Sequence, residues 1–183
     1  MNAGDFQAAA VAIYAIKHYT PAGGEESSEQ AIAKAVAWLE RAHPKTTQDR
    51  AFQALALAWA NDGSESARRS ARSLVARPRI DGGWSQITGM HSDAYATGQV
   101  LFALSVAGRM PASDPVFQKG IDYLLRTQAA DGTWHVKSRS IWLQPYFESG
   151  FPYGRDQFIS TAGTAWASMA LATAWQTPMT SQR

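Results

Sequence analysis

The chain repeats a pattern of two helices, and this repeat constrains its fold more than any other feature. Three helical segments that are apolar nearly all round open on Asp5, Asp49 and Asp93, which follow one another at intervals of 44 residues. Each acid suits the N-cap or first turn of a helix, where its charge meets the positive end of the helix dipole. Amphipathic segments lie between them. A repeat of this length predicts helical hairpins stacked side by side.

The pattern predicts seven helices in which apolar inner helices alternate with amphipathic outer ones. Inner helices are expected at residues 5–19, 49–60, 93–107 and 157–175, and outer helices at residues 29–42, 66–76 and 115–127. An inner helix should be buried on most sides, whereas an outer helix should bury one face only. In the last outer helix the expected buried side chains are Phe117, Ile121, Leu124 and Leu125. We therefore expect an all-α helical-hairpin repeat that forms a single domain over residues 1–183.

Composition excludes several classes of protein. Hydrophobic residues make up 45% of the chain and charged residues 17%, so it is not a disordered tail and has enough apolar surface for a core. The net charge is only +2, so we expect no nucleic-acid partner. No stretch approaches the length of a transmembrane segment. We expect a soluble chain, either cytoplasmic or exported from a longer precursor.

Metal and cofactor sites are also not expected. The chain has no cysteine, which excludes disulfides, thiolate zinc sites and cysteine nucleophiles. His43, His91 and His135 lack the close spacing of a metal site, and no glycine-rich phosphate loop is present. One basic cluster fits a solvated outer face, with an anionic partner as the alternative. It comprises Arg68, Arg69, Arg72, Arg77 and Arg79.

Two outer segments end in an Asp-Gly turn that is followed by a tryptophan. Asp-Gly supplies a residue with positive φ just past a helix end, and the tryptophan then folds back over that end. A glutamine before the second turn can hydrogen-bond to it. Structural clamps between hairpins are the expected role. The residues concerned are Asp81, Gly82 and Trp84 in the first turn and Gln128, Asp131, Gly132 and Trp134 in the second.

Residues 119–134 resemble the QW repeat of squalene–hopene and oxidosqualene cyclases, in the prenyltransferase/squalene oxidase repeat superfamily, and residues 79–84 resemble a degenerate second copy. The segments 92–99 and 134–157 also look like uncharacterised bacterial proteins that carry this cyclase-like domain. The resemblance implies an α/α-toroid, in which outer helices sheathe inner helices around an axis. Seven helices imply a partial toroid of about half a ring. A homodimer or a missing N-terminal half would complete it.

The chain also lacks motifs that define the catalytic members of these related families. Class II cyclases protonate their substrate with an Asp-x-Asp-Asp motif, and no such run is present. The cysteine that protein prenyltransferases use for zinc and the Cys-Gly-Glu-Gln motif of thioester proteins are absent as well. The resemblance implies an apolar or isoprenoid-type ligand in an aromatic-lined cavity, and without the Asp-x-Asp-Asp run we expect no protonation-driven cyclisation. The expected walls are Tyr95, Phe102, Trp142, Phe158 and Trp166.

An aromatic-rich insertion at residues 135–156 is the best candidate for a functional segment, because long loops in compact repeats are often functional. It is expected over the end of the central cavity, either as a ligand site or as a plug. Asp93 is expected first as a helix cap. With Glu148 or Asp156 it could instead form an acid/base pair. The predicted ligand-binding residues are Tyr95, His135, Arg139, Trp142, Tyr146, Tyr153 and Arg155.

Two other functions remain open from the sequence. Polysaccharide lyases and other sugar-active enzymes also use α/α-toroids, and Lys137, Arg139 and Tyr146 would then be the working groups. The third function is a non-catalytic protein-interaction module, in which the half-ring surface docks another domain. A toroid hosts unrelated chemistries, so the fold alone does not decide between them.

Overall fold

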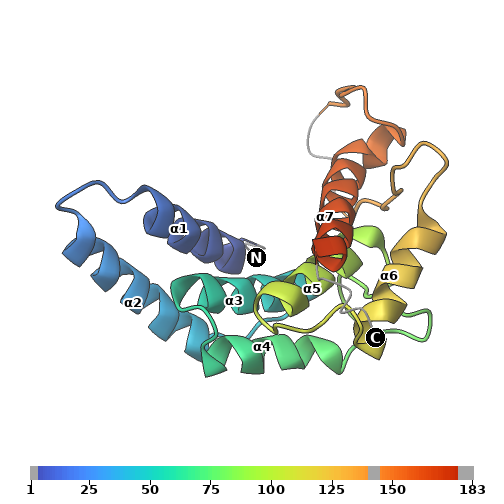
Figure 1. The fold of residues 1–183 in the computed structure, drawn as a ribbon. Coiled ribbons are helices and arrows are strands. Elements are labelled where there is room, and N and C mark those ends of the chain that lie inside the picture. Colours follow the sequence, from blue (N-terminus) through green and yellow to red (C-terminus); the bar gives the residue numbers. More distant parts are fainter. Residues whose placement is uncertain (1–3, 140–144, 177–183) are drawn as a thin grey trace. The chain divides into compact units, whose positions relative to one another are not determined.

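The computed structural model describes residues 4–139 and 145–176, which form seven α-helices, one short 3-10 helix and no strand (Figure 1). The prediction of an all-α chain with seven helices is confirmed, and the helices are consistent with part of an α/α-toroid. The α-helices are α1 (Asp5–Tyr19), α2 (Glu25–Arg41), α3 (Thr47–Ala60), α4 (Glu65–Val75), α5 (Ala94–Val106), α6 (Pro115–Thr127) and α7 (Gln157–Gln176). The 3-10 helix η1 (Gly154–Asp156) precedes α7.

The acids of the 44-residue repeat lie at helix N-termini, as predicted. Asp5 is in the first turn of α1. At α3, Asp49 N–H donates to Thr46 Oγ1 over 3.0 Å, and Asp49 Oδ2 accepts from Thr46 N–H over 2.9 Å. This reciprocal pair is a capping box. At α5, Asp93 Oδ1 accepts from the Ala96 amide over 2.8 Å.

The chain divides into two compact units, and the first contains α1 to α4 together with residues Ala103–Met110. Within it α3 packs against α1, α2 and α4 (Figure 1). Most of its side chains are buried, among them Phe52, Leu55 and Leu57. The expectation that the second inner helix is buried on most sides is therefore confirmed.

For α1 the same expectation is wrong. Only Phe6, Ala10 and Ile13 are buried, whereas Val11 and Tyr14 are exposed. In the part of the chain that the structure describes, the main neighbours of α1 are α2 and α3, and they leave these two side chains uncovered. An apolar composition therefore did not produce burial all round.

The second unit contains Pro78–Phe102 and the chain from Pro111 onwards, and in it α5 and α7 approach closely. A Cβ added at Gly98 would lie 2.5 Å from the backbone carbonyl carbon of Trp166, so only glycine fits there. The rings of Phe102 and Trp166 meet edge to face, with centroids 5.7 Å apart.

On α6, Phe117 and Leu124 are buried as expected. Leu125 was expected to face inward but is exposed, because it follows Leu124 by one residue and turns away from the buried face.

The last helix, α7, combines an apolar composition with an exposed side. It has no charged residue along its 20 positions. Ser160, Ala167 and Ala170 are buried, whereas Phe158 and Trp175 are exposed. No helix within the described ranges is sufficiently long and apolar to traverse a bilayer.

The contact between α5 and α7 predicts the effect of a single added methyl group. Gly98→Ala is expected to lower the free energy of unfolding by about 1–3 kcal/mol through overpacking, although alanine favours a helix interior by about 1 kcal/mol. Urea denaturation measures this difference. Gly4→Ala is the control, since nothing lies within 4 Å of a Cβ added there, and it should cost no more than about 1 kcal/mol. A Gly98→Ala variant as stable as the wild type would contradict the close packing.

Candidate functional site

The two Asp-Gly turns have the same geometry. Asp81 Oδ1 accepts from the Gly83 amide over 3.0 Å, and Asp131 Oδ1 accepts from the Thr133 amide over 3.0 Å. Gly82 has φ of 86° and Gly132 has φ of 83°, in the left-handed region that favours glycine. Each turn is closed by matching backbone hydrogen bonds. In the second turn, Gln128 Nε2 donates to the Gly132 carbonyl over 2.9 Å.

Each turn is tied to the inner helix that follows it. The backbone amide of Trp84 donates to Thr97 Oγ1 on α5 over 2.9 Å, and that of Trp134 donates to Thr164 Oγ1 on α7 over 3.0 Å. Both indoles are buried. The Trp134 indole N–H also donates to the carbonyl of Leu124 on α6 over 2.9 Å. Outer helix, turn and inner helix are thus joined by one tryptophan.

A pocket of about 390 Å³, the α5 pocket, lies where the segments after these tryptophans meet. Its lining comprises residues 89–93, which lead into α5, together with His135 and Lys137. Asp93 and His135 were predicted from the sequence as site residues. The pocket therefore combines a carboxylate, an ammonium group and two imidazoles, a set that suits a polar ligand or the polar end of one.

Asp93 is held on both carboxylate oxygens. Oδ1 caps α5, and Oδ2 accepts from Gln86 Nε2 over 2.8 Å. Burial raises the pKa of Asp93 above its ordinary value of 3.8, while these hydrogen bonds and the nearby Arg139 oppose the rise. The cap role is thus present, and a carboxyl with a raised pKa at a pocket wall is also suited to holding a proton.

His135 lies in a second cluster with Asp156 and Tyr153. Its Nε2 is 2.8 Å from Asp156 Oδ2, and its ring stacks on Tyr153 with centroids 4.7 Å apart. Burial acts to raise the pKa of Asp156. Hydrogen bonds from the Ser138 amide and His135 outweigh it, so this pKa is lowered. The Tyr153 hydroxyl is 2.7 Å from Thr133 Oγ1, which connects the insertion to the second Asp-Gly turn.

Arg139 is connected to Asp93 through Gln86, a residue that the sequence analysis did not predict. Its Nε donates to Gln86 Oε1 over 2.6 Å, and Gln86 in turn donates to Asp93. Gln86 is buried although it is polar. A signal was available, because Gln86 stands two residues after Trp84, where the second turn has the apolar Val136 after Trp134.

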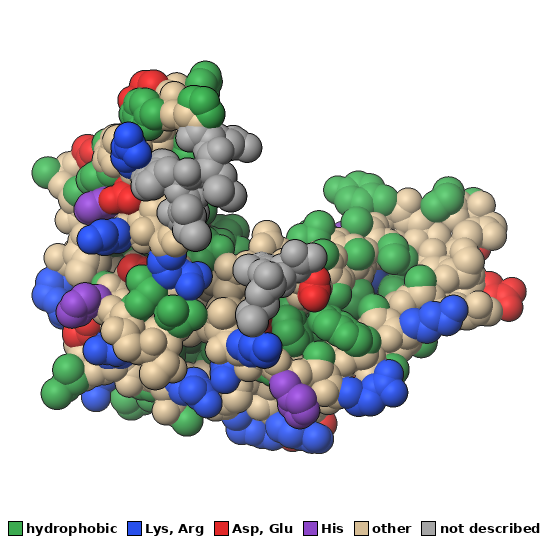
Figure 2. Space-filling model, turned by 180° about the vertical axis from the view of Figure 1, so that it is seen from behind, with side chains coloured by type: hydrophobic (Ala, Val, Ile, Leu, Met, Phe, Trp, Pro, Cys, Tyr) green, Lys and Arg blue, Asp and Glu red, His purple; other side chains and the backbone are tan. Residues whose placement is uncertain are grey.

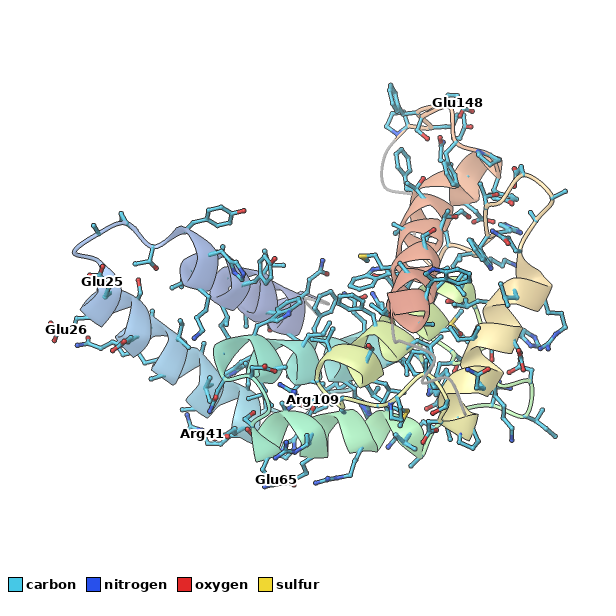
Figure 3. The ribbon with its side chains drawn as sticks, in the orientation of Figure 1. Glu25, Glu26, Arg41, Glu65, Arg109 and Glu148 are labelled. Atoms are coloured by element: carbon cyan, nitrogen blue, oxygen red, sulfur yellow. The ribbon has the colours of Figure 1, made fainter. Side chains whose placement is uncertain are left out.

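The outer part of the insertion forms its own contacts. The Tyr146 hydroxyl donates to the Glu148 carboxylate, which raises the pKa of Tyr146 and lowers that of Glu148. Glu148 lies in the loop before α7, at the position labelled in Figure 3. Gln157, at the start of α7, donates to the Phe147 carbonyl over 2.7 Å and fixes the base of this loop.

The predicted site residues thus fall into separate clusters. Asp93 is joined to Gln86 and Arg139, Asp156 to His135, and Glu148 to Tyr146. A pairing of Asp93 with Glu148 or Asp156 stays a prediction. Tyr95 is half-buried, Arg155 is exposed, and Trp142 lies outside the described residues. Among the described residues no group of three or more His, Asp or Glu could hold a metal ion.

One protein-family model matches most of the chain. The model of the squalene-hopene cyclase C-terminal domain matches residues 44–183. The match includes both Asp-Gly turns, the α5 pocket and helices α3 to α7, whereas α1 and α2 lie outside it. None of the curated proteins matches the chain.

The raised pKa of Asp93 predicts how its contribution to stability varies with pH. Between the ordinary pKa of 3.8 and the higher folded value, the folded chain binds a proton that the unfolded chain does not. The contribution of Asp93 is therefore complete below pH ~4 and is lost as the pH rises through the folded pKa.

Asp93→Asn keeps a capping oxygen but cannot titrate. The free energy of unfolding of the wild type should fall relative to that of Asp93→Asn as the pH rises above ~4, measured by urea denaturation between pH ~3 and ~7. Asp93→Ala serves for comparison, since it loses the cap and should cost about 1 kcal/mol. Parallel pH profiles for the wild type and Asp93→Asn would show that the carboxyl is not perturbed.

Proposed function

The chain belongs to the squalene-hopene cyclase C-terminal domain family, and we propose that it binds an apolar, isoprenoid-type ligand against the exposed sides of its inner helices. A single domain over residues 1–183 is part of the same proposal. The observation that carries it is the surface of α7, an inner helix without charge whose large apolar side chains reach solvent.

The exposed side of α7 contains both aromatic and flexible apolar groups. Phe158 is 60% exposed, Met169 38% and Trp175 91%. Such surface is costly in water, and a contiguous apolar patch on a folded domain commonly marks a binding site. Aromatic faces and a methionine also adapt to the bends of a polyene chain. An apolar ligand along this helix accounts for all three side chains.

The predicted cavity walls give further support. Phe102 and Trp166 pack together between α5 and α7, and Tyr95 is half-buried on α5. Burial raises the pKa of Tyr95. Trp142 stays a predicted wall.

The proposal concerns binding rather than an acid-initiated reaction. The Asp-x-Asp-Asp run that implies substrate protonation in class II cyclases does not occur in the sequence. Asp93 is also occupied on both oxygens by the α5 cap and Gln86. The domain would therefore shape and shield a ligand without itself starting cyclisation.

Geranylgeraniol, an isoprenoid alcohol of low aqueous solubility, is the probe for this proposal, and it is added below its solubility limit with the same cosolvent in cell and syringe. Isothermal titration calorimetry should show saturable binding to the wild type. A Phe158→Ser/Met169→Ser variant should bind at least tenfold more weakly, since burial of one large apolar side chain contributes about 1.5–3 kcal/mol. Both residues are exposed, so the variant is expected to fold.

Leu125→Ser is the matched control. Leu125 is 54% exposed but lies on the outer helix α6, so its loss should leave the affinity unchanged. Equal weakening by Leu125→Ser would indicate non-specific adsorption. No binding to the wild type, in repeated titrations of the folded chain, would reject the proposal.

A protein-interaction module is the second candidate, and the exposed side of α1 favours it. Val11 is 54% and Tyr14 42% exposed, and α1 lies outside the family match. The occupant would be a second copy of the chain or an N-terminal half. Sedimentation velocity tests the first of these: a wild-type dimer that Val11→Ser/Tyr14→Ser converts to a monomer would support it. A wild type that is monomeric at every concentration would exclude the homodimer.

A further inference from the structure

A second pocket lies in the first compact unit, and its lining includes two arginines of the basic cluster seen in the sequence. It has a volume of about 580 Å³ and is walled by the end of α2, the loop after it, α3 and α4. Its charged lining consists of Arg50, Arg69, Arg77 and Glu40, with His43 beside them. Three guanidinium groups thus face one carboxylate. We call this cavity the arginine pocket.

The arginines on α4 and just after it divide into two groups by their contacts. Arg68 Nε lies 3.3 Å from Glu65, which begins α4 (Figure 3), and Arg72 also pairs with Glu65. Arg69 and Arg77 instead line the arginine pocket, and neither makes an ion pair within the described part of the chain. On the face drawn in Figure 2, Lys and Arg side chains gather along the lower edge. From the sequence, all these arginines were expected to form one solvated outer face, with an anionic partner as the alternative.

Arg50 is fixed in the wall of the pocket. Its Nη1 donates to the Pro44 carbonyl over 2.7 Å, which holds the guanidinium against the loop after α2. Burial, followed by repulsion from Arg77, lowers the pKa of Arg50 below its ordinary value, and Asp49 offsets part of this. Two cations therefore oppose each other at this wall, and an anion between them would relieve the repulsion.

The rest of the lining is polar and already ordered. Gln53 Nε2 donates to the Leu39 carbonyl over 2.7 Å, and Gln53 Oε1 accepts from Ser70 Oγ over 3.3 Å, which connects α2, α3 and α4. Ser66 and Ser73 also line the pocket from α4. The Ser73 hydroxyl already donates to the Ser70 carbonyl over 2.7 Å, and the Ser70 hydroxyl donates to Gln53. The guanidinium groups are therefore the principal donors that this lining offers to a phosphate oxygen.

We propose that the arginine pocket binds the phosphate group of a small anion, with Arg69 and Arg77 as its principal ligands and Arg50 as the fixed wall. Planar guanidinium groups match phosphate oxygens in pairs, and the surplus of positive charge favours an anion with two or more charges. The ligand could be a free phosphate compound or a lipid headgroup, since both present the same chemistry. The site is independent of the apolar face on α7.

Inorganic pyrophosphate is the probe, measured by isothermal titration calorimetry at low and at physiological salt. We expect saturable binding at one site. Arg69→Gln/Arg77→Gln should weaken it by at least tenfold, because each lost charge-assisted hydrogen bond contributes about that factor or more. Arg68→Gln/Arg72→Gln is the matched control. It removes the same charge from the same helix on the side of Glu65 and should change affinity less than about threefold.

A flotation assay distinguishes the two sources of phosphate. Vesicles of phosphatidylcholine with and without phosphatidic acid are incubated with each variant. If only the vesicles with phosphatidic acid bind, and Arg69→Gln/Arg77→Gln alone loses this binding, the pocket takes a lipid phosphate. The proposal is overturned if neither pyrophosphate nor these vesicles bind to the wild type. It is equally overturned if both double variants lose binding to the same extent.

Discussion

The hydrogen bond from each turn tryptophan to a threonine of the next inner helix is the contact on which the second unit depends. A buried backbone amide without a partner costs about 1–3 kcal/mol. Both tryptophans are buried, and the described residues form no strand that could accept this bond. Thr97 and Thr164 supply the acceptor from a helix, where most carbonyls are already used. A small β-branched hydroxyl residue therefore fixes each turn against the inner helix that follows it.

The position of the α5 pocket follows from these two contacts. Its lining begins only a few residues after each tryptophan, so fixing the tryptophans also fixes the segments that carry Asp93 and His135. The close approach at Gly98 adds a second constraint, because any larger residue would separate α5 from α7. Polar groups then complete the site: Gln86 joins Asp93 to Arg139, and Asp156 joins His135 to the Ser138 amide. The close packing of α5 on α7 and these hydrogen bonds thus hold the lining of the α5 pocket in the same arrangement.

Much of the fold could be predicted from sequence, because helical periodicity is a local signal. The bounds expected for α1 and α6 agree with the structure, and the acid of each repeat lies at a helix start. Exposure could not be predicted in the same way. Val11 on α1 and Leu125 on α6 are apolar yet exposed, since burial depends on which helices cover a face and not on composition. The sequence also could not predict which arginines pair with Glu65. That pairing depends on the positions of the side chains in space, which a count of charges does not give.

Native mass spectrometry of the chain incubated with geranylgeraniol shows whether this family member binds an apolar molecule. We expect a mass increase of one ligand per chain or per assembled ring that survives gentle transfer to the gas phase. Organic extraction should recover the same molecule from the complex. A spectrum that shows only the bare chain at every ligand concentration, from protein whose folding circular dichroism has verified, would contradict the account.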